Sequence, residues 1–277
     1  MASTGGEKVL ETRPYGDVLQ IRLSQTFNGQ PLYWVAAYLV DGLLVDSGCE
    51  HTADELTEFL SNYPLEQIVN THYHEDHIGA NARLFRQRRP SIYAHRDSIP
   101  LMQQTPVLFP YQEVAWGYPQ PCQAQELGTT IKTKSHTFQV LPTPGHCPGH
   151  VVLLEKNQGW CFSGDLFVSE RPKVLRPEEN VYQIMESLRL LLDNAGADFT
   201  LFTSIGAVVE NGAEAVNNLL AYLEKTIAAI LDYDRRGYTI DAIRQELFGG
   251  ESRMAGVSNG QFSVDNLINS ALSRGYR

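Results

Sequence analysis

The residues best suited to chemistry lie in one short run, Thr71-His72-Tyr73-His74-Glu75-Asp76-His77. The run holds three imidazoles and two carboxylates, and a borderline cation such as zinc binds imidazole nitrogen together with carboxylate oxygen. If the run begins extended, His72 and His74 point the same way, because side chains repeat every second residue. Asp76 and His77 then face a neighbouring point. The spacing favours two metal positions, as in two-metal hydrolases, over a solvated histidine-rich loop.

Two later motifs also place metal-binding residue types directly after strand-like segments. Pro142-Thr143-Pro144-Gly145-His146-Cys147-Pro148-Gly149-His150 follows residues 138–141, and residues 159–165 read as a strand that ends in Gly164-Asp165. In this order, after the first run, His146 and Asp165 are predicted metal ligands. For His150 we expect a buried, hydrogen-bonded supporting role, with direct ligation as the alternative.

The elements around these motifs must bring them together. The histidine run lies between a strand predicted over residues 65–70 and a helix predicted over residues 78–85, at a strand's carboxyl end where α/β sites usually form. Further strands are predicted over residues 18–23, 34–40, 43–46 and 198–203, and further helices over residues 52–62, 179–194 and 213–233. Asp41-Gly42 indicates a hairpin turn, and Thr52 is the expected helix N-cap. Asp46-Ser47-Gly48 ends a strand near the site, either as a plain turn or with a direct role.

The order of the motifs HxHxDH, PTPGHCPGH and FSGD resembles that of the metallo-β-lactamase-fold hydrolase superfamily, in particular its glyoxalase II-like branch. The resemblance covers about residues 15–230. It implies an α+β fold, a four-layer αββα sandwich with a dinuclear metal site at one edge of the paired sheets. Carried over by position, it implies that the first metal is held by His72, His74 and His146. The second would be held by Asp76 and His77, with Asp165 bridging both.

One position departs from the family pattern. The family usually completes its second site with a late histidine after a strand, but Ile205 stands at that place and no histidine follows His150. Isoleucine cannot bind a metal, so the second site is expected to be weaker. The chain then uses a weak second metal completed by water, or one metal, or Ile205 is an engineered substitution, or the protein has drifted towards binding. The absence of later histidines argues against a shifted alignment.

These motifs predict a metal-dependent hydrolase of a small acyl substrate, first a thioester and otherwise a lactone or ester. The metal would activate water and polarise a carbonyl, while Asp76 orients the nucleophile or moves its proton. One or two zinc ions are expected, with iron or manganese as alternatives. A second hypothesis is a sulfur-dioxygenase-like enzyme with one Fe(II) on His72, His146 and Asp165. A third is a non-catalytic ligand-binding or regulatory protein on the same fold.

Two segments are expected to face the substrate. Residues 103–127 combine four prolines with aromatic side chains, which predicts an irregular lid or, equally, a surface loop packed by its own aromatics. The predicted substrate-binding residues there are Phe109, Tyr111, Trp116 and Tyr118. Residues 236–277 are predicted to form a helical appendage to a main domain over residues 1–235, with helices over residues 239–248 and 263–273 and Ser263 as an N-cap. Tyr238, Arg253 and Phe262 are further candidate substrate contacts there.

Composition and charge narrow the classes of protein to which the chain can belong. The 277-residue chain has a net charge of −10, which argues against a duplex nucleic-acid surface. No apolar run approaches the length of a membrane span, and residues 1–8 are small and polar, unlike a secretory signal. Cys49, Cys122, Cys147 and Cys161 lack paired spacing and are expected to be reduced thiols, as in a cytoplasmic protein. A homo-oligomer remains compatible with the sequence.

Overall fold

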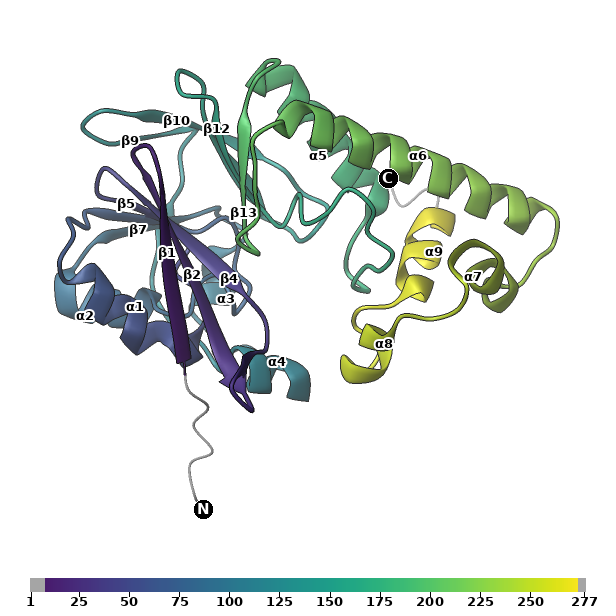
Figure 1. Ribbon diagram of the computed structural model, residues 1–277, viewed down its shortest axis with the longest axis horizontal. Helices are drawn as coiled ribbons and strands as arrows, with labels where there is room; N and C mark the ends of the chain where they lie inside the picture. The colour runs from purple at the N-terminus through teal and green to yellow at the C-terminus, as the bar shows by residue number, and fades with distance from the viewer. Residues whose placement is uncertain (1–7, 274–277) are drawn as a thin grey trace.

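The chain folds into four layers, with two β-sheets in the middle and helices outside them (Figure 1). The computed structural model describes residues 8–273, so most of the polar N-terminal segment lies outside the described residues. One apolar core lies between the sheets and includes Tyr38 and Val40 of the first sheet and Phe138 and Phe162 of the second. Two other cores lie between each sheet and its helices. This arrangement confirms the expected αββα sandwich.

The first sheet has the strand order β1-β2-β4-β5-β6-β7-β8, with β3 paired to β2. Its strands are β1 (Lys8–Tyr15), β2 (Val18–Phe27), β3 (Gln30–Pro31), β4 (Val35–Val40), β5 (Leu43–Val45), β6 (Gln67–Val69), β7 (Ser91–Ala94) and β8 (Gln125–Glu126). Asp41 and Gly42 both have positive φ angles, 47° and 80°, and join β4 to β5 as the predicted hairpin. Strands β5 to β8 run parallel, so their carboxyl ends meet at one edge.

The second sheet has the strand order β14-β13-β12-β11-β10-β9. Its strands are β9 (Thr130–Lys132), β10 (Thr137–Pro142), β11 (Val151–Glu155), β12 (Trp160–Gly164), β13 (Thr200–Thr203) and β14 (Val208–Val209). All five residues of β11 are buried, because Leu153 faces the first sheet while Val152 and Leu154 face the helices. A strand covered on both faces therefore reads as a continuous apolar run.

Helices cover the outer face of each sheet. The helices beside the first sheet are α1 (Ala53–Leu60), α2 (Asn81–Arg88), α3 (Ile99–Met102) and α4 (Pro110–Ala115), and those beside the second sheet and beyond it are α5 (Val181–Ala195), α6 (Gly212–Arg235), α7 (Ile240–Phe248), α8 (Arg253–Val257) and α9 (Val264–Leu272) (Figure 1). Within residues 8–273, no helix combines the length and the apolar character needed to cross a membrane.

Three local predictions need correction. Thr52 does not cap α1 through its side chain, because its hydroxyl donates to the carbonyl of Cys49 instead. The helix expected from residue 78 begins at Asn81, because Gly79 packs directly on the Cys49 backbone, where an added Cβ would lie 2.1 Å from the carbonyl carbon. Residues 103–127, predicted to be irregular, contain α4 and β8. By contrast, the Ser263 hydroxyl accepts from the amide of Asn266, as expected of the N-cap of α9.

Candidate metal centre

Three loops that follow strands meet at one edge of the two sheets. Residues 70–77 follow β6, residues 143–150 follow β10, and Asp165 follows β12. The second and third loops come from neighbouring parts of the second sheet, and the amide of Val151 donates to the carbonyl of Thr71 across the sheets at 2.8 Å. The predicted motifs are therefore brought together by strand ends from both sheets.

The first group of converging atoms consists of imidazole nitrogens. His74 Nδ1 lies 3.0 Å from His72 Nε2 and 2.9 Å from His146 Nε2. Nitrogens bound tetrahedrally to one zinc ion at about 2.0 Å lie about 3.3 Å apart, so the spacing of these three atoms is close to that of a ligand set. Cys147 Sγ also falls within this group, in which all ligand atoms lie within 4.8 Å of one another. Burial raises the pKa of the Cys147 thiol. The thiol therefore stays protonated, and it is less suited to binding a metal than the three imidazoles are.

A second group lies beside the first and contains carboxylates. His77 Nε2 lies 3.4 Å from Asp165 Oδ1 and 3.7 Å from Asp76 Oδ2. The other oxygen of Asp165 lies 3.4 Å from His146 Nε2, so Asp165 stands between the two groups. His77 Nε2 is buried and has no hydrogen-bond partner among the described residues. An unpartnered buried nitrogen facing two carboxylates fits a cation position.

Burial sets the protonation of several of these groups. Burial, with His77 and His74 nearby, lowers the pKa of His72 well below its ordinary value, so its imidazole is neutral and keeps a lone pair for a metal. Burial raises the pKa of Asp76 to about 7, although the neighbouring His77 opposes that shift. Two more carboxylates, Glu75 and Asp165, contribute to the rise.

Asp46 and Thr71 support His72 and His77 on the side away from the other ligand atoms. The sequence left open whether Asp46 forms a plain turn or has a direct role. The amide and hydroxyl of Thr71 donate to the two Asp46 oxygens, each at 2.8 Å. His77 Nδ1 donates to Asp46 Oδ2 at 2.8 Å, and His72 Nδ1 lies 3.0 Å from the Thr71 hydroxyl. Because the Thr71 proton is used on Asp46, His72 Nδ1 must donate to Thr71. Both imidazoles thereby turn Nε2 and its lone pair towards the metal centre.

Glu179 supports His146 and was missed by the sequence analysis. His146 Nδ1 donates to Glu179 Oε1 at 2.5 Å, and the other carboxylate oxygen accepts from the amide of Arg176 at 2.7 Å. Glu179 directly precedes Asn180, the N-cap of α5, so the start of this helix positions it. No ligand-like spacing surrounds Glu179, and a carboxylate two residues before a helix does not by itself indicate a functional residue.

His150 lies behind the centre and outside both ligand groups. Its Nε2 accepts from the amide of Asp165 at 3.1 Å, and its Nδ1 lies 2.8 Å from the Thr143 hydroxyl. Burial lowers the pKa of His150 to about 3, so the ring is neutral. In this position His150 fixes the backbone of Asp165, which agrees with the supporting role expected for it.

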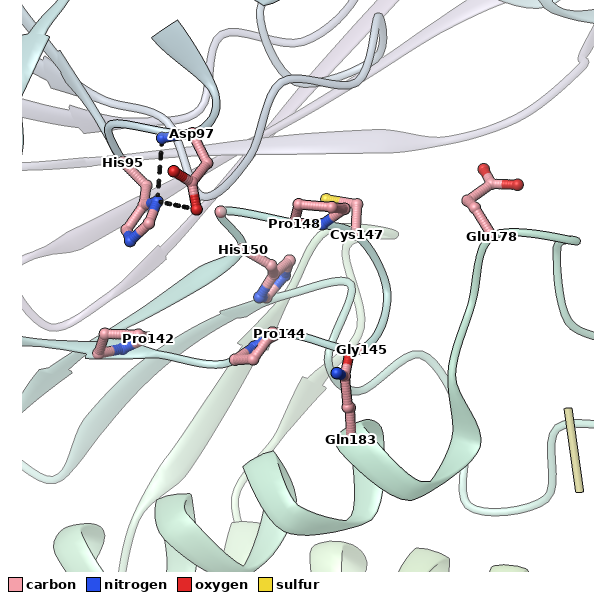
Figure 2. A pocket seen from close by; sticks show the side chains of 11 residues that line it. His95, Asp97, Pro142, Pro144, Gly145, Cys147, Pro148, His150, Glu178 and Gln183 are labelled. Carbon is pink, nitrogen blue, oxygen red and sulfur yellow. Dashed lines mark hydrogen bonds and ion pairs between the residues drawn. The ribbon is translucent and has the colours of Figure 1, made fainter. Parts of the chain in front are cut away.

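The glycines of the PGHCPGH loop allow it to pack closely against two neighbours. Figure 2 shows residues of this loop lining a pocket of 310 Å³. A Cβ on Gly145 would lie 2.4 Å from the Ile184 amide nitrogen of α5, and one on Gly149 would lie 2.7 Å from the Ser98 hydroxyl. Both glycines have positive φ angles, 131° and 76°. Close approach on both sides therefore fixes the position of His146.

A larger cavity of 860 Å³ opens in front of the metal centre. His74, Asp76, His146 and Asp165 lie at its polar end. Of the predicted substrate-binding residues, Tyr111 and Trp116 line the cavity, whereas Phe109 and Tyr118 are not among its lining residues. Phe109 instead stacks on Tyr111, with ring centroids 6.3 Å apart. Among the C-terminal candidates Phe262 lines the cavity, and Tyr238 and Arg253 do not.

Comparison with known proteins agrees with this geometry. Residues 35–204 match the family model of the metallo-beta-lactamase superfamily, which is more than half of the chain. The chain belongs to the metallo-beta-lactamase superfamily.

Relatives in the superfamily are distant. A probable metallo-hydrolase of Bacillus subtilis, YybB, is 28% identical over half of this chain, and the match spans only 62% of that protein's length. The hydroxyacylglutathione hydrolase GloC of Haemophilus influenzae is 24% identical over 63% of this chain and 84% of its own length. The atrochrysone carboxyl ACP thioesterase of Aspergillus fumigatus is 22% identical over 94% of this chain and 76% of its own.

Solved structures are also similar to this chain in fold. A beta-lactamase domain protein from Burkholderia ambifaria has a TM-score of 0.71 at 18% identity, covering 98% of this chain and 89% of that chain, which shows a shared fold. The protein TTHA1623, solved in a di-iron-bound form, has a TM-score of 0.55 at 29% identity, covering 67% of this chain and 94% of its own.

Ile205 is the residue predicted to stand where the superfamily pattern has its last ligand. It sits half-buried in the turn after β13. Strand β13 runs parallel to β12, and Thr203 pairs with Gly164, so Ser204 comes opposite Asp165 and Ile205 lies one residue further along the loop. Among the described residues, the first group of converging atoms offers three imidazoles, and the second offers one imidazole with two carboxylates.

Proposed function

We propose that this metallo-hydrolase of the metallo-beta-lactamase superfamily hydrolyses acyl thioesters. The observation that carries the proposal is the convergence of four imidazole nitrogens and two carboxylates next to the polar end of an 860 Å³ cavity. Such a centre needs no protein nucleophile, because metal-activated water attacks the carbonyl. The names of two relatives, a hydroxyacylglutathione hydrolase and an ACP thioesterase, support thioesters ahead of lactones and other esters.

The ligand roles follow the two groups. His72, His74 and His146 would hold the first cation, and Asp76 and His77 the second, with Asp165 shared between them. A cation bound there supplies Lewis-acid chemistry, which activates water and polarises a carbonyl. Imidazole and carboxylate donors suit zinc, iron and manganese alike. Asp76 also lines the cavity, so we assign it the orientation of the attacking water and acceptance of its proton.

Arg176 is positioned to hold an oxygen atom of the substrate. It is 9% exposed, lines the cavity, and places Nη1 3.5 Å from His74 Nδ1. Glu178 Oε1 lies 2.8 Å from its Nε. Burial alone would lower the pKa of Arg176, but Glu178 and Glu75 raise it, so the guanidinium stays charged. A buried guanidinium beside the centre can donate to a carbonyl or carboxylate oxygen.

The test is thiol release from acyl thioesters by protein purified without chelator, together with its metal content. We expect turnover that is lost on chelation and restored by zinc, iron or manganese. His146→Ala should lose both metal and turnover, whereas His95→Ala, which changes a histidine outside both ligand groups, should lose neither. Thiol release that survives complete metal removal would overturn the proposal.

The two alternative functions give different results in the same experiment. Iron as the only bound metal, with oxygen consumption and no thiol release, would favour the sulfur-dioxygenase-like hypothesis. The di-iron-bound form of a relative at 29% identity is the reason to include iron. No turnover of thioesters, lactones or esters with any of the three metals would favour a ligand-binding role.

A further inference from the structure

We infer that the substrate carries a large apolar acyl group, which fills the cavity in front of the metal centre. This inference rests on the proposed hydrolase function and differs from the small acyl substrate expected from the sequence. The cavity volume of 860 Å³ lies near the top of the range of about 300–1,000 Å³ for pockets that enclose an organic ligand. An acetyl or hydroxyacyl group would leave most of this volume filled with water.

The inner wall of the cavity is apolar away from the metal centre. Side chains from the segment after β12 and from α5 and α6 form the inner wall, and they include Leu166, Val174, Leu175, Ile184, Leu219 and Leu223. Most of these residues belong to the core between the second sheet and its helices. The cavity is thus an opening into the core, where water gains few hydrogen bonds and an apolar group is favoured.

The mouth of the cavity is largely apolar as well, although the exposed Arg171 and Lys173 also line the cavity. Six of the exposed large hydrophobic residues among the described residues line this one cavity: Leu32, Tyr33, Val114, Val168, Met254 and Val257. Val257, on α8, is 66% exposed, and Val114, on α4, is 55% exposed. Helices α4 and α8, which carry these two residues, lie to the left and right of each other in the lower part of Figure 1. Exposed apolar residues that gather around one concavity mark a ligand site.

Aromatic rings close one side of the cavity. Trp116 packs edge-on against Tyr33 and Tyr111, with ring centroids 5.4 Å and 6.0 Å away, and Tyr111 packs against Phe262 at 5.9 Å. These rings come from the segment after β3, from α4 and its end, and from the segment before α9. All four line the cavity. They provide a broad, rigid surface for apolar contact at low entropic cost.

Chain length is the first variable to test. With metal-loaded protein, kcat/KM for thioesters of the same thiol should rise from acetyl to decanoyl. Each buried CH2 is worth about a fourfold gain, so the series should span at least roughly a hundredfold. A flat series, or one that falls with length, would overturn the inference while leaving thioester hydrolysis intact.

Binding provides a readout that does not depend on turnover. Dansyl-labelled undecanoic acid should bind the protein with enhanced fluorescence. Leu32→Asp at the mouth should weaken that binding by about tenfold or more, because a charge then borders the apolar site. Leu101→Asp is the matched control, since Leu101 is 44% exposed, against 40% for Leu32, and is not a lining residue. Equal binding to both variants would overturn the inference. Probe binding lost only in Leu32→Asp, without thiol release, would keep the inference and reject the proposed hydrolysis.

Discussion

Three imidazoles at the metal centre use one nitrogen for the centre and the other for an oxygen of the protein. His72 is held by Thr71, His77 by Asp46 and His146 by Glu179. Each of these contacts fixes the ring orientation and the tautomer, so that the lone pair faces the cation position. We therefore expect the oxygen partners to affect how well the centre binds metal, although none of them is a proposed ligand.

Glu179→Gln tests this support at His146. The neutral amide cannot stabilise the imidazole as the carboxylate does, so we expect metal affinity to fall about tenfold to a hundredfold. Competition with a chromophoric chelator measures the change. Glu178→Gln is the matched control, because the neighbouring carboxylate contacts Arg176 and not a histidine. Equal affinity in the two variants would contradict a supporting role for Glu179.

Ile205→His tests the missing ligand. We expect one tightly bound ion in the parent protein and two in the variant, because a histidine after β13 would join Asp76, His77 and Asp165. Elemental analysis of both proteins purified without chelator gives the count. Ile205→Leu controls for a change of shape without a new donor. Two ions in the parent protein would mean that the second position is complete without a side chain at residue 205.

Sequence spacing predicted the histidines and aspartates of the site but not their supports. HxHxDH has ligand residues so close together that few arrangements fit them, and the structure brings His72, His74 and His77 to one place. Glu179 meets His146 only because α5 begins beside the PGHCPGH loop. A contact between residues 33 positions apart depends on how the layers pack, which single-sequence patterns do not encode.

Helix α4 shows that single-sequence patterns can also fail to predict a whole element. The prolines of residues 103–127 predicted an irregular segment, yet Pro110 occupies the first turn of α4, where its missing amide proton costs nothing. The helix is tied to the histidine run, because Gln112 Nε2 donates to Glu75 Oε1 at 2.6 Å. His51 Nε2 lies 2.7 Å from the carbonyl of Glu113. These contacts fix the aromatic side of the cavity relative to the metal centre.

Gln112→Ala should release α4 from the histidine run. Glu75 is 5% exposed and would lose a partner, so we expect the free energy of unfolding to fall by about 1–3 kcal/mol. KM for long acyl thioesters should rise at the same time. Urea unfolding and steady-state kinetics measure the two effects. Gln104→Ala, which removes an exposed side chain bonded only to Pro100, should change neither value.

At the scale of the whole molecule, the C-terminal helices share a core with the sandwich. Leu267 and Ile268 of α9 belong to the same buried cluster as Leu188 of α5 and Leu219 of α6. The amide of Val181, which begins α5, donates to the Ser270 hydroxyl at 2.9 Å. We therefore propose that residues 236–277 form an appendage that does not fold independently of residues 1–235.

Leu267→Ala tests that organisation. Leu267 is 1% exposed, so its truncation should cost about 2–5 kcal/mol. The unfolding curve should shift as one cooperative transition, because the helix and the sandwich lose the same core. Far-UV circular dichroism and tryptophan fluorescence provide two probes of that transition. If the probes separated into two steps, with only the first shifted, the appendage would be an independent unit.

The shape of the cavity also governs how fast metal exchanges. His72 is fully buried and His77 is 2% exposed, whereas the cavity reaches the centre at His74, Asp76, His146 and Asp165. An ion held there would therefore leave by the same route that the proposed acyl group would occupy. A bound long-chain ligand would block that route, so chelators should remove metal from the ligand-bound protein more slowly than from the ligand-free protein.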